Sequence, residues 1–197
     1  MKNVFVVYAH PSHDSFTFKV KEAFLEGLEK SGKKAVVSDL YKMKFNPVIS
    51  ETEYLREAYY DESKPVPSDV VNEQKKIDDA DAVVFIYPDF WTASPAVLEG
   101  WFQRVLTYGY AYGDAPKMKI IKKAVFLMTM GGCMKDEIRQ RELEAMKTIM
   151  IGDRLKGRVE STEFYVFDEM TRGYGSVRRE ENMEKFLKTA EQAAIDL

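Results

Sequence analysis

Unbroken apolar runs constrain the fold of this chain more than any other feature of its sequence. Val4–Tyr8 and Ala82–Tyr87 are continuous apolar segments of strand length, and a similar segment covers Lys123–Met130. Strands that are apolar on both faces are typical of a parallel sheet covered by helices on each side. Segments with one apolar face lie between these runs, as expected for the crossover helices that join parallel strands. The pattern predicts an α/β fold built on a parallel sheet.

Together with two further strand-like segments, Lys34–Leu40 and Val159–Phe167, these runs predict five strands. The simplest arrangement is the flavodoxin-like doubly wound five-stranded parallel sheet, order 2-1-3-4-5. Ser68 and Ser94 are predicted to cap the third and fourth helices, with Pro95 in the first turn of the fourth. The predicted strands are Val4–Tyr8, Lys34–Leu40, Ala82–Tyr87, Lys123–Met130 and Val159–Phe167; the predicted helices are 15–32, 51–59, 69–80, 95–107, 136–150 and one from about Val177.

Length and composition favour one α/β domain spanning residues 1–197 rather than two domains. A formal net charge of −3 gives no general attraction to nucleic acid, and no apolar stretch reaches the length needed for membrane insertion. A single cysteine forms no internal disulfide, which suits a cytoplasmic protein. Two histidines and one cysteine offer no zinc-ligand spacing, so we expect no metal site.

Ligands of this fold bind at the carboxyl ends of the strands, where three loops stand out. The first loop, Ala9–Thr17, leads into a helix whose free N–H groups at Ser15, Phe16 and Thr17 would face an anion. His10 either contacts a phosphate, which we favour, or is bonded to the neighbouring loop backbone. Asp14 is unfavourable beside an anion, and we expect its side chain to point away. No glycine-rich nucleotide loop is present.

The second loop, Pro88–Thr92, carries adjacent aromatic residues, Phe90 and Trp91. They are either core residues beneath the loop or an exposed platform that a flat ligand covers. Both lie outside the strand, which favours the platform and therefore a planar cofactor. The third loop, Thr129–Gly132, ends in paired glycines that allow a ligand to approach the backbone.

Two further segments extend this interpretation. The helix 95–107 is apolar over more than one face, which we interpret as a subunit contact in a homodimer. The segment Tyr108–Tyr112 is a tyrosine cluster, which suits either a flat substrate or a subunit contact. Cys133 is interpreted as a small residue after a turn. Lys135 and Arg139 are weak candidates for supplying positive charge to the ligand.

These loops resemble those of the NAD(P)H:quinone oxidoreductase family, the DT-diaphorase type with its shorter bacterial relatives. The similarity extends over nearly the whole chain, and its most specific segments are Ala9-His10-Pro11 with Ser15-Phe16, Ser38–Tyr41 with Phe45-Asn46-Pro47, Glu73–Lys76, Pro88–Phe102, Tyr110-Ala111-Tyr112 and Gly131-Gly132. The resemblance implies a homodimer that binds FAD (alternatively FMN) without a covalent bond and uses NAD(P)H as co-substrate.

The resemblance also implies roles for individual residues. The flavin diphosphate is expected to bind at the first loop, through His10, Ser15, Phe16 and Thr17. The isoalloxazine ring is expected to lie along the second loop, at Pro88, Asp89, Phe90, Trp91 and Thr92, with its pyrimidine end at Thr129, Met130, Gly131 and Gly132 of the third loop. The substrate pocket is expected to include Trp91, Tyr110 and Tyr112, with Tyr112 reaching from the neighbouring subunit. One departure is clear. Well-known members carry a tyrosine and a histidine after the paired glycines, where this chain has Cys133–Arg139, so no catalytic pair is carried over.

The resulting prediction is a flavin-dependent oxidoreductase that transfers hydride from NAD(P)H to a quinone or similar flat, small-molecule acceptor by a ping-pong, two-electron mechanism. The alternative is a non-enzymatic flavoprotein, either an electron carrier or a regulatory subunit of a transport system.

Overall fold

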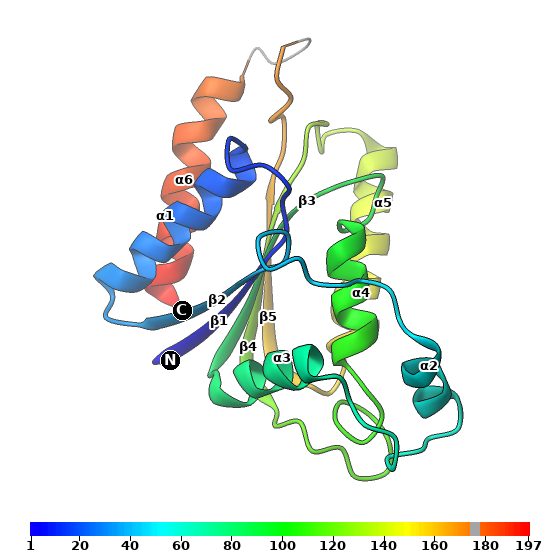
Figure 1. Ribbon diagram of the computed structural model, residues 1–197. Helices are drawn as coiled ribbons and strands as arrows, with labels where there is room; N and C mark the ends of the chain where they lie inside the picture. Colours follow the sequence, from blue (N-terminus) through cyan, green and yellow to red (C-terminus); the bar gives the residue numbers. More distant parts are fainter. Residues whose placement is uncertain (174–177) are drawn as a thin grey trace.

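A parallel sheet forms the centre of the computed structural model, which describes residues 1–173 and 178–197 (Figure 1). Its strands are hydrogen-bonded in the order β2-β1-β3-β4-β5, and every neighbouring pair is parallel. The predicted flavodoxin-like fold class is therefore confirmed. The strands are β1 (Asn3–Tyr8), β2 (Lys34–Asp39), β3 (Ala82–Pro88), β4 (Ile121–Thr129) and β5 (Val159–Phe167).

Helices cover both faces of the sheet (Figure 1). α1 (Phe16–Lys30) and α6 (Arg179–Asp196) pack together on one face, and α3 (Ser68–Asp79), α4 (Ala96–Val105) and α5 (Glu137–Lys147) lie on the other. The short helix α2 (Glu51–Ala58) lies beyond α4, away from the sheet. The predicted start of the last helix near Val177 falls outside the described residues.

Side chains of the central strands alternate between two cores. Phe5 and Phe85 belong to the core beneath α3, α4 and α5, whereas Val4 and Val84 belong to the core beneath α1 and α6. Because both faces are buried, β3 is apolar throughout and β1 is apolar at every position after Asn3, which is why their sequences predicted the sheet. The edge strand β2 is exposed over most of its length.

The apolar breadth of α4 has a different cause from the predicted subunit contact. Val97, Leu98 and Trp101 are buried within the single chain. The segment before α2 also covers the helix, since a Cβ added at Gly100 would lie 2.2 Å from the backbone oxygen of Pro47. The interpretation of this breadth as a sign of a partner was therefore wrong, because the chain itself supplies the second surface.

Three helix boundaries differ from the predictions. Pro67 and Pro95 occupy the N-cap positions of α3 and α4, and neither helix has a side-chain cap, so the predicted caps Ser68 and Ser94 were wrong. The predicted helix 136–150 is α5 followed by a π-helical turn, Thr148–Asp153.

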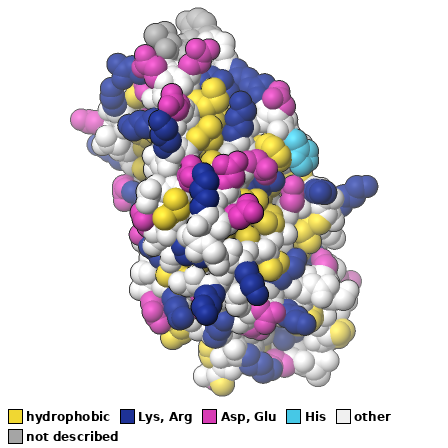
Figure 2. Space-filling model, turned by 90° about the vertical axis from the view of Figure 1, so that its left-hand side faces the viewer, with side chains coloured by type: hydrophobic (Ala, Val, Ile, Leu, Met, Phe, Trp, Pro, Cys, Tyr) yellow, Lys and Arg dark blue, Asp and Glu magenta, His cyan; other side chains and the backbone are white. Residues whose placement is uncertain are grey.

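The surface over α1 and α6 mixes basic and acidic side chains rather than separating them (Figure 2). This agrees with the small net charge of −3. Within the described part of the chain, none of the helices combines the length and the apolar character needed to cross a membrane.

Candidate functional site

A pocket of about 320 Å³ lies at the carboxyl edge of the sheet. The loops after β1, β3 and β4 line it, as predicted, and the segment after β5 contributes as well. Its lining residues are His10, Ser12, Asp14, Ser15, Phe16, Thr17, Pro88, Asp89, Phe90, Thr129, Met130, Gly131, Met170, Arg172 and Arg179. Most of the predicted cofactor residues are thus brought together, whereas Trp91, Thr92 and Gly132 lie beside the lining.

One end of the pocket is the N-terminus of α1. Ser15 caps this helix, since its Oγ accepts a hydrogen bond of 3.0 Å from the Phe18 N–H. The following N–H groups of the first turn lack intrahelical partners, and such a turn favours a negatively charged group. The sequence pattern at 9–17 therefore folds into a helix N-terminus that is suited to an anion.

His10 is bonded to the neighbouring loop backbone, and it also lines the pocket. Its Nδ1 lies 3.0 Å from the Ser12 backbone nitrogen and 3.1 Å from the Ser12 oxygen, so the loop backbone engages this ring atom. Nε2 is left for a ligand in the pocket that His10 lines. Burial lowers the pKa of His10 from its usual range, which favours the neutral ring in the ligand-free protein. In that form His10 is a hydrogen-bonding group and not a cation.

Positive charge comes instead from residues that the sequence did not indicate. Arg172 and Arg179, in the segment after β5 and at the start of α6, line the pocket. Arg172 also pairs with Asp14, with 3.3 Å between Nη1 and Oδ2. Asp14 was expected to point away; it lies on the rim and is neutralised there by this arginine. The signal missed was that the fifth strand also ends at the ligand edge of the sheet.

The loop after β3 forms the aromatic wall. Trp91 is 100% exposed and Phe90 is 43% exposed, so they form an exposed platform and the alternative of core residues was wrong. Trp91 and Thr92 have φ values of 57° and 59°, a left-handed conformation that is unfavourable for side chains of this size. Such strain is typical of sites held in a functional geometry. The Phe90 N–H donates to Ala93 O at 2.9 Å and closes the turn.

Asp89 stands between this wall and the floor of the pocket. Its N–H donates to the Thr129 backbone oxygen at 2.7 Å, which fixes it at the end of the sheet. Its Oδ1 is buried, with no hydrogen-bond partner among the described residues. Burial raises the pKa of Asp89 above the usual carboxyl range.

The floor is held by a buried hydrogen bond of 2.7 Å between the hydroxyl oxygens of Thr17 and Thr129. It joins the helix after β1 to the end of β4. Gly131 allows the Thr171 side chain to approach its backbone closely, since a Cβ added at Gly131 would lie 2.5 Å from Thr171 Oγ1. The Thr171 hydroxyl donates to Gly131 O at 2.8 Å.

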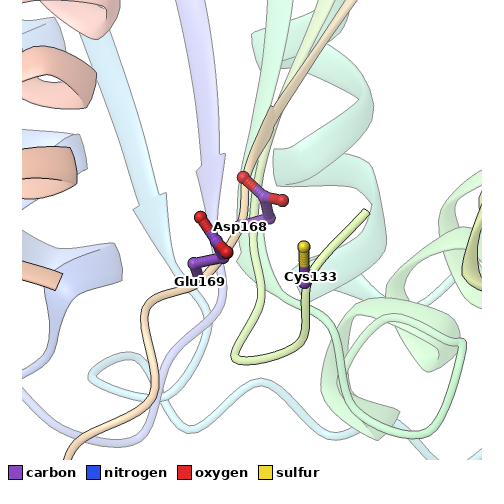
Figure 3. A group of neighbouring side chains, drawn as sticks. All are labelled: Cys133, Asp168 and Glu169. Carbon is purple, nitrogen blue, oxygen red and sulfur yellow. The ribbon is translucent and has the colours of Figure 1, made fainter. Parts of the chain in front are cut away.

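Cys133 stands where the resembled family carries its catalytic pair, and two carboxylates lie beside it (Figure 3). Cys133 Sγ and one carboxylate oxygen from each of Asp168 and Glu169 lie within 4.8 Å of one another. The sequence did not predict this group because its members come from the loops after β4 and β5. Asp168 Oδ2 accepts from the Met134 N–H at 2.9 Å, and the cysteine lowers the pKa of Glu169. These contacts order the loop.

The two weak catalytic candidates lie outside the pocket lining. Lys135 is exposed, and Arg139 pairs with Glu142 at 2.9 Å. Arg139 nevertheless lies close to the paired glycines, with its Nε 3.5 Å from a Cβ added at Gly132. Its positive charge also counteracts the rise in the Asp89 pKa.

Tyr110 and Tyr112 lie beyond the end of α4, and α4 begins at the pocket edge and runs away from it. The Tyr110 hydroxyl donates to the Asp78 carboxylate at 2.9 Å, and that of Tyr112 to Glu57 at 2.6 Å. Within one subunit these tyrosines do not reach the pocket. Any role in substrate binding requires the pocket of a second subunit.

The residues of the pocket fit a flavin. A helix N-terminus with Arg172 and Arg179 suits a phosphate group, and the loop at Phe90 and Trp91 suits a flat ring. The free oxygen of Asp89 is a polar atom that requires a ligand group or water as partner.

Comparison with known proteins agrees with this geometry. Residues 2–154 match the family described as Flavodoxin-like fold, and the chain belongs to this family. The structure is similar to an NAD(P)H:quinone oxidoreductase from Methanothermobacter marburgensis, with a TM-score of 0.90, 39% identity and coverage of 98% of this chain and 94% of that one.

Similar proteins of known sequence are also named as NAD(P)H-dependent quinone dehydrogenases. The chain is 42% identical over 149 residues to NAD(P)H dehydrogenase [quinone] 1 of Rattus norvegicus, and 39% identical over 150 residues to that of Cavia porcellus. Both matches cover 67% of this chain but 54% of the relative, so the chain spans about half the length of these proteins. The resemblance to the NAD(P)H:quinone oxidoreductase family is confirmed.

Proposed function

We propose that this chain is a flavin-dependent oxidoreductase that transfers hydride from NAD(P)H to a quinone or similar flat acceptor. The observation that carries the proposal is the pocket at the carboxyl edge, which combines an anion-binding end with an exposed aromatic wall. The names of the similar proteins support the same activity. The bound flavin would supply the hydride chemistry.

The chain's own residues would position the cofactor. Ser15, Phe16 and Thr17 at the start of α1 would hold its diphosphate, with the neutral His10 and Arg172 beside them. FAD is the proposed form, with FMN as the alternative.

The acceptor would bind over the exposed ring face beside Trp91. Because donor and acceptor would use the same position, we propose ping-pong turnover. Tyr110 and Tyr112 of a second subunit would complete this position in a homodimer, in the cytoplasm, with residues 1–197 forming one flavin-binding domain. The proposed roles of Thr92, Gly132, Lys135 and Arg139 are secondary, because none of them lines the pocket.

Steady-state oxidation of NADH and NADPH by the flavin-loaded protein, with a simple benzoquinone as acceptor, tests the proposal. We expect turnover that requires the quinone, and parallel lines in double-reciprocal plots. A flavin-loaded protein with negligible turnover that stabilises one-electron reduced flavin would contradict it and favour the electron carrier or regulatory subunit instead.

A further inference from the structure

One carboxylate oxygen of the pocket has no partner within the protein. Among the described residues, three buried side-chain polar atoms lack a hydrogen-bond partner: the hydroxyls of Tyr8 and Tyr87, and Asp89 Oδ1. Only Asp89 is a carboxyl group and only Asp89 lines the pocket. A buried carboxylate oxygen without a partner is costly, so a proton or a ligand hydrogen is expected to satisfy it.

Around Asp89, the backbone N–H groups of Thr92 and Ala93 lower its pKa, but burial outweighs them. Tyr87 on β3 is neutral, since burial raises its pKa. Arg139 and Glu142 from α5 act on Asp89 in opposite directions, and they pair with each other at 2.9 Å. Across the pocket, Arg172 pairs with Asp14 in the same way, while Arg179 and the neutral His10 complete the titratable lining.

We propose that Asp89 contacts the bound cofactor and takes up a proton from solvent when the cofactor receives hydride. The inference rests on the proposed function and names a catalytic group within that site. A carboxyl at this position was expected only to line the ring, through a segment shared with the resembled family. The free oxygen of Asp89 gives this side chain a role of its own.

The charge balance of the reaction requires such a group. NADH delivers a hydride, which carries two electrons and one hydrogen nucleus, and thereby adds one negative charge to the pocket. In a partly desolvated site this charge increases the proton affinity of a neighbouring carboxylate, which then binds a proton from water. Reduction of a quinone to a hydroquinone needs one hydride and one proton. Asp89 would hold that proton beside the acceptor.

Proton uptake during the first half-reaction tests the inference directly. Flavin-loaded protein is mixed without oxygen in weak buffer with one equivalent of NADH and a pH indicator, over a range of starting pH. Conversion of NADH to NAD⁺ by hydride transfer releases no proton, so the indicator reports uptake by the protein and its cofactor. We expect wild type to take up about one proton more per flavin than Asp89→Asn at the pH of greatest difference. Equal uptake at every pH would overturn the inference.

Asp79→Asn is the matched control, because Asp79 is exposed at the end of α3, on the opposite edge of the sheet. It should take up as many protons as wild type. In the second half-reaction we expect Asp89→Asn to reduce benzoquinone about 100-fold more slowly than wild type, as expected for loss of a proton donor. An unchanged rate would count against Asp89 as that donor.

A measurement on wild type alone covers the case in which Asp89→Asn fails to fold or to bind flavin. Carbon-13 NMR of labelled aspartate carboxyls follows the titration of Asp89 in flavin-free, oxidised and reduced protein. We expect a midpoint for Asp89 above the ordinary carboxyl range, and a further rise on reduction. A midpoint unaffected by reduction would overturn the inference while leaving the flavin-dependent activity intact. A protein that binds no flavin would instead remove the proposed function itself.

Discussion

Two polar regions of the molecule differ in whether their buried charged groups have hydrogen-bond partners within the protein. In the first, the Arg104 cluster (Arg104, Glu53 and Asp69) between α2, α3 and α4, every charged group has a partner. Arg104 is only 5% exposed, and its guanidinium donates to Glu53 at 2.7 Å and to Asp69 at 2.6 Å. In the second, the pocket at the carboxyl edge of the sheet, Asp89 Oδ1 has no partner within the described chain.

The difference separates structural from functional polar groups. A buried charge that is fully paired holds elements together, and breaking the pair leaves an uncompensated charge. A buried oxygen without a partner destabilises the empty site and is retained where a ligand satisfies it. Substitutions in the Arg104 cluster should therefore affect folding, and those in the pocket should affect the ligand.

The largest expected effect is that of Arg104→Ala on stability. It removes the opposite charge beside the buried Glu53, which keeps its bonds from Ser50, and also frees the Asn46 oxygen, to which Arg104 donates at 2.7 Å. We expect a loss of about 3 kcal/mol in the free energy of unfolding, measured by urea denaturation of flavin-free protein. Arg141→Ala, at an exposed position of α5, is the control and should change little. A loss in Arg104→Ala below about 1 kcal/mol would remove the contrast between the regions.

The next largest effect is that of Arg172→Ala on flavin affinity. Its side chain is 62% exposed, so the flavin-free protein should unfold as wild type does. Loss of a charge-assisted contact to phosphate should weaken flavin binding about tenfold, measured by quenching of flavin fluorescence. The same Arg141→Ala variant serves as control. If Arg172→Ala bound flavin as wild type does, the phosphate would lie elsewhere.

How far the sequence predicted these regions can be judged from particular residues. The continuous apolar strands β1 and β3 identified the sheet and its ligand edge, because burial on both faces leaves a pattern that a sequence displays directly. Ser15 and Gly131 were found for the same reason, since they lie in the loops that follow recognisable strands. The side-chain contacts of Arg104 left no such pattern, because they join segments far apart in the chain.

The remaining errors have identifiable physical causes. Arg172 was missed because the last strand, β5, is only partly buried and its end was not considered as a ligand loop. The predicted caps failed because Pro67 and Pro95 have the extended backbone of an N-cap themselves, with ψ near 146° and 144°. The π-helical turn after α5 leaves no regular sequence signal.

A smaller effect concerns pH. Folding raises the pKa of Asp89, so the folded state binds this proton more tightly than the unfolded state does. The resulting stabilisation is present below the ordinary carboxyl range and is lost as pH rises through the folded-state pKa. Asp89→Asn should therefore gain stability relative to wild type as the pH rises above the ordinary carboxyl range. Thermal unfolding of flavin-free protein at a series of pH values measures this stability difference between Asp89→Asn and wild type. A difference that does not change with pH would contradict a raised pKa of Asp89.

The smallest expected effect on stability is that of Trp91→Ala. The side chain is 100% exposed, so the free energy of unfolding should stay within about 0.5 kcal/mol of wild type. The KM for benzoquinone should nevertheless rise about fivefold, as expected for a lost aromatic contact. Tyr59→Ala, which removes another exposed aromatic, is the control and should leave KM unchanged. A large loss of stability with an unchanged KM would identify Trp91 as a structural residue.

The central claim is that the carboxyl edge of the sheet binds a flavin, and release of the cofactor tests it most directly. Purified protein, incubated with FAD or FMN and then freed of excess, is denatured, and the supernatant is analysed by absorption spectrum and mass. We expect about one flavin per chain, predominantly FAD, and less in Arg172→Ala. A supernatant without either flavin would contradict the account.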